Sequence, residues 1–122
     1  MTPDRPTRQE QAQAILRRRA RALASQIIGH RASTAADFAE ALTLERIDVL
    51  SEIPDAAALL SLGMNRVGPR DGLYVLRSGN GFRVYLQEGG VPHRERDGLS
   101  FDEARDAVID ELVMLNGIPF SV

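Results

Sequence analysis

The stretch from Gly72 to Gly90 limits the possible folds of this 122-residue chain more than any other segment. Apolar or aromatic side chains alternate with others over residues 73–77 and again over residues 82–86, with Asn80-Gly81 between the two runs. Alternation with a period of two indicates half-buried strands, and an Asn-Gly pair between such runs is typical of a tight hairpin. We therefore predict an antiparallel hairpin with its turn at Asn80-Gly81.

A third extended segment and a helix follow this hairpin. Residues 91–97 come after Gly89-Gly90 and are polar on both faces, and Pro92 has no N–H for a ladder, so they favour an edge strand or a protruding ribbon over a central strand. Ser100-Phe101-Asp102-Glu103 has the pattern of a capping box, which starts a helix. Asn116-Gly117 is expected to end this helix. Its buried side is expected to contain Ala104, Ala107, Val108, Ile109, Leu112, Val113 and Leu115.

The first half of the chain is predicted to be helical. Thr7-Arg8-Gln9-Glu10 is another capping box, and apolar residues recur with helical spacing up to Ile28. Gly29 then provides a C-terminal stop. We predict a single helix from Thr7 to about Ile28.

Shorter helices are expected between this helix and the hairpin. Ser33 or Thr34 can cap a second helix. Residues 43–53 are compatible with a helix or a strand, and we favour the helix. Asp55 then favours a further helix start, and Gly63 is expected to end that short helix.

These elements together predict an α+β fold: N-terminal helices, then a three-stranded antiparallel meander, then a C-terminal helix, with helices covering one face of the sheet. The 43% hydrophobic and 26% charged content is typical of a globular protein, and the length suits one domain. We expect a single domain over residues 1–122, with a helical part in residues 1–63 and the meander and last helix in residues 64–122.

The composition excludes several classes of function. The chain has no cysteine, which excludes a disulfide framework, thiolate metal sites and cysteine nucleophiles. No apolar run approaches the roughly 20 residues that a membrane-spanning helix needs. The first residues also lack the apolar core of a secretory signal. We therefore expect a cytoplasmic protein with no membrane partner.

Charge is distributed unevenly along the chain. Residues 1–31 contain seven arginines and two acids, whereas the rest contains eight arginines and fifteen acids. The basic first helix either packs on the acidic remainder, which we favour, or contacts nucleic acid through Arg17, Arg18 and Arg21. Nucleic acid is the less favoured partner because this helix has no aromatic side chains for stacking on bases. The same helix could pack on a second copy, so a homodimer is a further alternative.

No pattern of catalytic or metal-binding residues stands out. His93, Glu95 and Asp97 share one face of the predicted edge strand. Positions i, i+2 and i+4 on a strand extend over roughly 13 Å, which is too far for one ion to contact all three. No serine lies in a nucleophile elbow, and no helix follows Gly79-Asn80-Gly81 to bind phosphate. We therefore expect no catalytic residue, no metal site, no cofactor and no enzymatic activity.

Acidic residues near the C-terminus form the candidate site. Asp102, Asp106 and Asp110 recur at four-residue spacing on the predicted last helix, where they are either an ordinary solvated face or a docking surface. Complementary charge speeds the encounter of two proteins and increases specificity, so a docking surface of this kind suits a basic protein. The predicted contact residues are Glu88, Glu95, Asp97, Asp102, Glu103, Asp106 and Asp110.

Residues 71–76, 81–90 and 99–104 resemble small bacterial immunity proteins of polymorphic-toxin systems. In those families an aromatic-containing strand pair leads to a turn resembling Glu-Arg-Gly, a polar strand and a helix that starts near a Phe. This chain departs from the pattern at Phe82, where members often have Trp, and at Gly89, where they often have Arg. The resemblance implies a non-enzymatic cytoplasmic protein that binds and blocks a cognate toxin.

Overall fold

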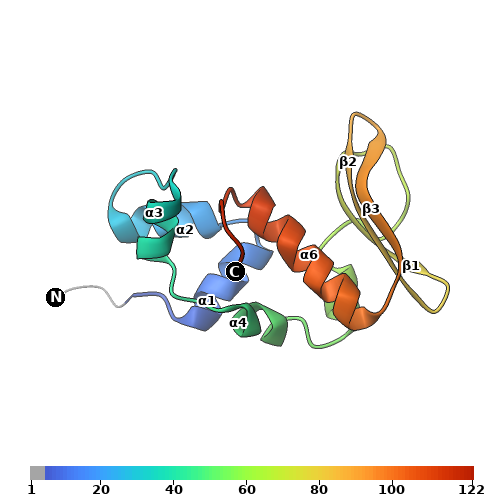
Figure 1. Cartoon of the computed structure of the whole chain (residues 1–122), viewed down its shortest axis with the longest axis horizontal. Helices are drawn as coiled ribbons and strands as arrows, with labels where there is room; N and C mark the ends of the chain where they lie inside the picture. Colours follow the sequence, from blue (N-terminus) through green and yellow to red (C-terminus); the bar gives the residue numbers. More distant parts are fainter. Residues whose placement is uncertain (1–4) are drawn as a thin grey trace. The chain divides into compact units, whose positions relative to one another are not determined.

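The computed structural model describes residues 5–122, which contain six helices and three strands (Figure 1). Residues 1–4, part of the segment in which we looked for a secretory signal, lie outside the described residues. The helices are α1 (Arg8–Leu16), α2 (Ala20–Ile28), α3 (Ala35–Ala41), α4 (Arg46–Ser51), α5 (Ala56–Leu60) and α6 (Phe101–Leu115). The strands are β1 (Gly72–Ser78), β2 (Gly81–Glu88) and β3 (Val91–Leu99).

The predicted α+β fold class is confirmed. The sheet is antiparallel with strand order β1-β2-β3, which is the expected meander, and α6 follows β3. Short helices α3, α4 and α5 form where they were predicted. Thr34 and Asp55 cap α3 and α5, because their side-chain oxygens accept hydrogen bonds from the N–H groups of Asp37 and Ala58 at 3.1 and 2.9 Å.

The chain forms two compact units. Unit 1 comprises the residues up to Glu52 together with Leu112–Val122, and unit 2 comprises Ile53–Glu111. Helices α1 to α4 therefore belong to unit 1, and α5 and the sheet belong to unit 2, while α6 begins in unit 2 and ends in unit 1. This division differs from the expected boundary after residue 63, because the C-terminal residues pack with the N-terminal helices.

In unit 2, aromatic side chains lie on both faces of the sheet. Tyr74 and Tyr85 are cross-strand partners, and their rings stack with 4.8 Å between centroids. Phe82 lies on the opposite face, because it is three residues from Tyr85 on the same strand. There its ring centroid is 6.3 Å from that of Phe101 in α6. We call these the tyrosine face and the phenylalanine face of the sheet.

The irregular segment before β1 covers the tyrosine face. Met64 packs against Tyr74 and its neighbours. The Gln87 side-chain amide donates hydrogen bonds to the carbonyls of Gly68 and Arg70, each at 3.0 Å, and the Tyr74 hydroxyl bonds the same two carbonyls. Helix α6 packs on the phenylalanine face. The prediction placed helices on one face of the sheet, and the structure has the irregular segment on the other.

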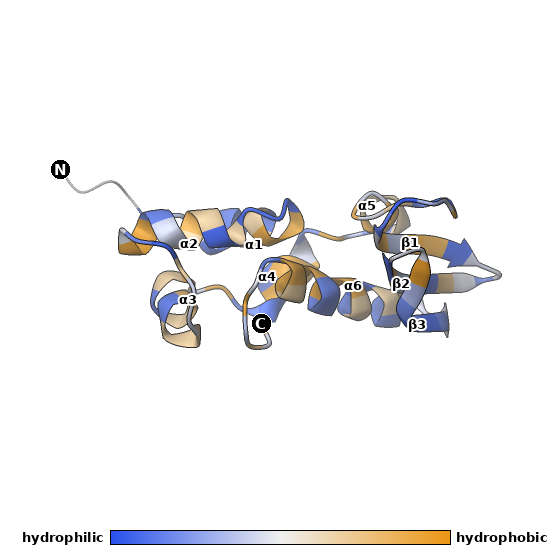
Figure 2. Ribbon diagram, turned by 90° about the horizontal axis from the view of Figure 1, so that it is seen from above, coloured by the Kyte–Doolittle hydropathy of each residue, from blue (hydrophilic) through white to orange (hydrophobic). Residues whose placement is uncertain are grey.

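The predicted edge strand is confirmed as β3. Every residue from Val91 to Gly98 is exposed, and most of the strand is hydrophilic (Figure 2). Its pairing with β2 is interrupted by two irregularities, in the intervals that contain Arg94 (φ 50°) and Gly98 (φ 68°). Such bulges, together with charged side chains, discourage a sheet edge from pairing with another strand.

The first hairpin turn lies one residue earlier than predicted. Ser78 pairs with Gly81, so the two turn residues are Gly79 and Asn80, and Gly79 has a φ of 58°. Glycine at the first of two turn positions is typical of a type II′ turn. Gly81 instead belongs to β2, where a β-carbon would collide with the carbonyl oxygen of Leu99. Gly79-Asn80 and Asn80-Gly81 are both suitable turn sequences. The close approach of the Leu99 carbonyl to Gly81 favours the turn at Gly79-Asn80.

The predicted second turn, Gly89-Gly90, is confirmed, and the carboxylate of Asp71, the residue before β1, holds it. Both glycines have a left-handed backbone, with φ of 60° and 78°. Their N–H groups donate hydrogen bonds to the Asp71 carboxylate at 2.9 and 3.0 Å. The Gly90 and Gly89 N–H groups lower the pKa of Asp71 below its usual value. The carboxylate therefore stays charged and fixes the turn at neutral pH.

The prediction of a single helix from Thr7 to Ile28 is wrong, because the chain breaks between α1 and α2. Arg18 has a φ of 59°, the Arg18 N–H donates to the Ile15 carbonyl at 3.1 Å, and the Arg19 N–H donates to the Ala14 carbonyl at 2.7 Å. These bonds form a Schellman motif, which normally has glycine at the left-handed position. We call residues 17–19 the elbow. The predicted capping box at Thr7 and the stop at Gly29 are both present.

A buried side chain from near the C-terminus holds the elbow. The Asn116 side-chain oxygen accepts a hydrogen bond from the Ala20 N–H at 3.0 Å, and its amide nitrogen donates to the Ile15 and Leu112 carbonyls at 2.9 and 2.7 Å. The Ile15 carbonyl and the Ala20 N–H lie at helix ends, where regular helical bonding stops. Asn116 therefore joins α1, α2 and α6, a role beyond the helix end that was predicted for it.

The buried side of α6 differs from the prediction at one residue. Six of the seven predicted core residues are buried, but Leu115 is 38% exposed. Leu115 is the last residue of the helix, and the chain turns away directly after it at Gly117, which has a φ of 78°. Packing beyond the helix end is made by Ile118, which is 4% exposed.

Replacing Arg18 by glycine should stabilise unit 1 by about 1 kcal/mol. A left-handed backbone costs a residue with a side chain roughly 1–2 kcal/mol, and the greater entropy of glycine in the unfolded chain offsets part of the gain. Urea unfolding measures the change. Arg17→Gly is the matched control: Arg17 has a φ of −93°, so this variant should not stabilise. A loss of stability in Arg18→Gly would contradict the strain assigned to the elbow.

Candidate functional site

Four exposed acids lie on the first part of α6, within unit 2. The helix starts as predicted: the Ser100 N–H donates to the Glu103 carboxylate at 3.0 Å, and the Glu103 N–H donates to the Ser100 hydroxyl at 3.1 Å. Each helical residue rotates by about 100° and rises by 1.5 Å, so the four acids share about 100° of the circumference over about 12 Å. We call them the acidic face: Asp102, Glu103, Asp106 and Asp110.

Local hydrogen bonds favour the charged state at the start of this surface. The backbone N–H of Ser100 and, to a smaller extent, its hydroxyl lower the pKa of Glu103. Asp97 lies just before the helix, and a hydrogen bond from the Ser78 hydroxyl, followed by one from the Gly98 N–H, lowers its pKa. Both carboxylates are therefore ionised well below neutral pH.

Arg105 offsets part of the charge of the acidic face. Its guanidinium lies 3.2 Å from the Asp102 carboxylate, and it also donates to the Ile53 carbonyl and lies over the Phe101 ring. The pair leaves 81% of the Asp102 side chain exposed. An exposed ion pair of this kind contributes little to stability, so Asp102 stays accessible to a partner.

The structure separates Glu95 and Glu88 from the acidic face. Glu95 pairs with Arg83 at 2.8 Å, and Arg83 lies over the Tyr85 ring, so this pair is on the tyrosine face, away from α6. Glu88 pairs with Val91 at the start of β3. That position is about 26 Å along the strand from the start of α6. Four of the seven predicted contact residues therefore form the acidic face. Asp97 precedes α6, but it accepts a hydrogen bond from Ser78, which shares the tyrosine face with Tyr74.

Glu111 is a further acid of α6, but the structure gives it a structural role. Its side chain is 4% exposed and accepts two hydrogen bonds from Arg94 of β3, at 3.0 and 2.8 Å. Two parallel bonds between a guanidinium and a carboxylate are stronger and more directional than a single one. The sequence does not distinguish Glu111 from the exposed acids, because its partner lies on a strand seventeen residues away.

The arginines considered for nucleic acid lie at or near the elbow in unit 1. Arg17 and Arg18 are exposed, and so is Arg19. Arg21 differs, because it is half-buried, its guanidinium lies against Gly117 and its Nε is buried. The break in the helix thus brings three exposed arginines together and directs Arg21 into packing.

No protein-family model, curated protein or solved structure matches the chain. The chemistry of the acidic face and of the elbow must therefore carry any functional conclusion, because a fold class by itself does not define a function.

Residues 5–122 contain neither a membrane-spanning helix nor a cluster of metal ligands. No helix in this range is long and apolar enough to cross a bilayer. The same residues hold no group of three His, Asp or Glu side chains arranged for a metal ion. His93, Glu95 and Asp97, the set considered from sequence, do not converge: Glu95 binds Arg83, and Asp97 accepts from the Gly98 N–H at 2.7 Å.

Proposed function

We propose that this protein is a non-enzymatic binding protein that neutralises a cognate bacterial toxin in the cytoplasm. The observation that carries the proposal is the acidic face, four exposed carboxylates on one side of a helix. A basic toxin surface, such as the substrate groove of a nuclease, would be attracted to it. The resemblance of the hairpin and the start of α6 to immunity proteins supports the same function.

The placement of the acidic face suits rapid and specific docking. Charges on a protein surface are screened within about 8 Å at physiological ionic strength, so steering needs several carboxylates close together. The capping box at Ser100 fixes the start of the helix that carries them, which limits the ordering cost of binding. Association with the toxin should therefore be fast at low salt and should slow as salt is added.

Growth rescue provides the assay for this function. The protein encoded by the adjacent upstream reading frame is expressed in bacteria with and without this chain. The proposal requires that the neighbour inhibits growth and that co-expression restores it. A harmless neighbour, or inhibition that this chain does not relieve, overturns the proposed function.

Reversing two charges of the acidic face should slow docking. We expect the double variant Asp106→Lys and Asp110→Lys to lower the association rate with the purified toxin by about tenfold or more at low salt, with a smaller effect on dissociation. Stopped-flow mixing at several salt concentrations measures this, and the difference from the parent chain should shrink as salt rises.

A matched control keeps the change in net charge the same. Glu40→Lys with Glu52→Lys makes the same two charge reversals at residues of unit 1 that are not part of the acidic face, and should slow association much less. Circular dichroism verifies that both double variants fold. Equal rates for the two double variants would remove the acidic face as the docking surface, even if growth rescue succeeds.

The exposed arginines of the elbow favour a second candidate, nucleic-acid binding. Phosphate contacts by arginine give affinity that falls steeply with salt and depends little on sequence. A nucleic-acid strand bound to the outer surface of the elbow would contact Arg17, Arg18 and Arg19 equally.

A further inference from the structure

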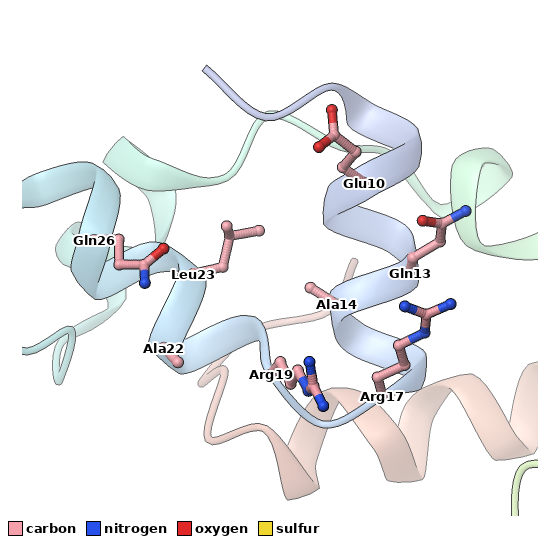
Figure 3. A pocket seen from close by; sticks show the side chains of 8 residues that line it. All are labelled: Glu10, Gln13, Ala14, Arg17, Arg19, Ala22, Leu23 and Gln26. Carbon is pink, nitrogen blue, oxygen red and sulfur yellow. The ribbon is translucent and has the colours of Figure 1, made fainter. Parts of the chain in front are cut away.

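An open hollow of about 340 Å³ lies inside the elbow, between α1 and α2 (Figure 3). All of its lining residues belong to unit 1. Leu23 points into the space between the two helices, Arg17 and Arg19 lie near the elbow, and Glu10 lies at the far end of α1 (Figure 3). The hollow therefore has a basic end, an apolar wall and an opening to solvent.

The unusual backbone of the elbow decides which arginines reach the hollow. Arg17 and Arg19 both line it, whereas Arg18 between them does not. Arg18 carries the left-handed φ of 59°. In a continuous helix, side chains two residues apart would point about 200° apart, so the break is what brings Arg17 and Arg19 to one space. Strained backbone of this kind is concentrated at functional sites in proteins.

The two lining arginines have no side-chain partner among the described residues, in contrast to three arginines that are held in ion pairs. Arg8, Arg83 and Arg94 each lie 2.8 Å from a carboxylate oxygen. Within residues 5–122, neither Arg17 nor Arg19 makes a side-chain hydrogen bond or ion pair. Two guanidinium groups without a counter-ion therefore face the same hollow.

Glu10 also lines the hollow but does not neutralise these charges. Its carboxylate accepts a hydrogen bond from the Thr7 N–H at 3.1 Å in the capping box of α1. Glu10 and Arg17 are seven positions apart, which corresponds to about 10 Å along the helix axis. The negative charge is thus held at one end of the hollow and the positive charges at the other.

We infer that this hollow binds a small organic phosphomonoester. Guanidinium groups are planar and donate paired hydrogen bonds that match phosphate oxygens, so the phosphate would lie at Arg17 and Arg19. Gln13 and Gln26 add amide groups from the two helices, and Leu23 with two alanines provides an apolar wall for the organic part. The volume lies at the lower end of the roughly 300–1,000 Å³ that small-molecule sites occupy.

The site is independent of the proposed toxin neutralisation. It belongs to unit 1, whereas the acidic face belongs to unit 2, and the two carry opposite charge. Absence of phosphomonoester binding would say nothing about toxin neutralisation, which growth rescue tests. Failure of growth rescue would likewise say nothing about ligand binding in the hollow.

Phenyl phosphate is the probe, because it combines a dianion with an apolar ring. We expect saturable binding to the full chain in calorimetry, with the arginine Nε resonances of Arg17 and Arg19 shifting in NMR spectra. Arg17→Gln and Arg19→Gln should each weaken binding by about tenfold or more, the loss expected for a charge-assisted hydrogen bond. Circular dichroism verifies that each variant folds.

Arg18→Gln is the matched control, since it removes the same charge from the neighbouring position. It should weaken phenyl phosphate binding by less than about twofold, because a more distant exposed charge is screened. Leu23→Ala should weaken the binding of phenyl phosphate but not that of inorganic phosphate, which has no apolar part.

Two results would overturn the inference. One is the absence of saturable phenyl phosphate binding at low salt. The other is an equal loss in all three arginine variants, which indicates diffuse attraction. In that case a short single-stranded DNA is titrated. If the DNA binds more tightly than phenyl phosphate and loses affinity equally in all three arginine variants, the exposed arginines of the elbow form a nucleic-acid-binding surface instead.

Discussion

Replacing Asn116 by alanine should destabilise unit 1 by about 3 kcal/mol. The substitution removes three hydrogen bonds and leaves the Ala20 N–H buried without its acceptor. A buried polar group that loses its partner costs about 1–3 kcal/mol, and the lost bonds to Ile15 and Leu112 add to that cost. Urea unfolding gives the total, and hydrogen exchange of the α1 and α2 amides shows whether the loss is local to unit 1.

Asn65→Ala is the control for Asn116→Ala. Asn65 is exposed and lies in unit 2, so its truncation should change stability by no more than about 0.5 kcal/mol. A decrease of less than about 1 kcal/mol in the free energy of unfolding of Asn116→Ala would mean that other contacts hold the elbow and that the Asn116 amide contributes little to it.

Replacing Arg94 by methionine should destabilise unit 2 by about 2 kcal/mol. Glu111 would keep its charge in a site where 4% of its side chain is exposed, without the two hydrogen bonds that compensate it. Breaking a fully buried ion pair costs about 3–5 kcal/mol, and the value expected here is smaller because 45% of the Arg94 side chain is exposed.

A double-mutant cycle separates the pair from its surroundings. Glu111→Met in the Arg94→Met background should recover most of the stability, because replacing both partners removes the uncompensated charge. Arg96→Met on the same exposed strand is the control and should have little effect. If the single and double variants were equally unstable, the loss would come from packing of the methionine and not from Glu111.

Local sequence signals predicted the ends of helices well. The capping boxes at Thr7 and Ser100 are formed as expected, since each needs only residues within one turn. The meander and its exposed third strand were likewise predictable. The alternation of apolar residues and the missing N–H of Pro92 are local features that can be read from each strand's own sequence.

The elbow could not be predicted, because the local sequence does not mark it and the residue that holds it is distant in the chain. An arginine occupies the position where glycine would mark a Schellman motif, and apolar spacing continues through the break. The side chain that holds the elbow, Asn116, lies 96 residues from its partner Ala20. Tertiary hydrogen bonding thus overrides the helix propensity of Arg17 and Arg18.

The candidate site was predicted in part. Regular spacing identified Asp102, Asp106 and Asp110 on α6, and all three are exposed. Charge patterns do not report which side of a sheet a residue occupies, so Glu95 was grouped with them although it pairs with Arg83 on the tyrosine face. The hollow in the elbow left no sequence signal, because it exists only where the first helix breaks.

The order of synthesis gives the arrangement of unit 1 a consequence for the growing chain. Unit 1 is discontinuous, since residues up to Glu52 pack with Leu112–Val122, and Asn116 belongs to the second of these segments. Unit 2 is complete once residue 111 has been made, whereas α1 and α2 wait until residues 112–122 have been translated. A prematurely terminated chain would keep apolar helix surfaces uncovered, which marks it for chaperones and proteases.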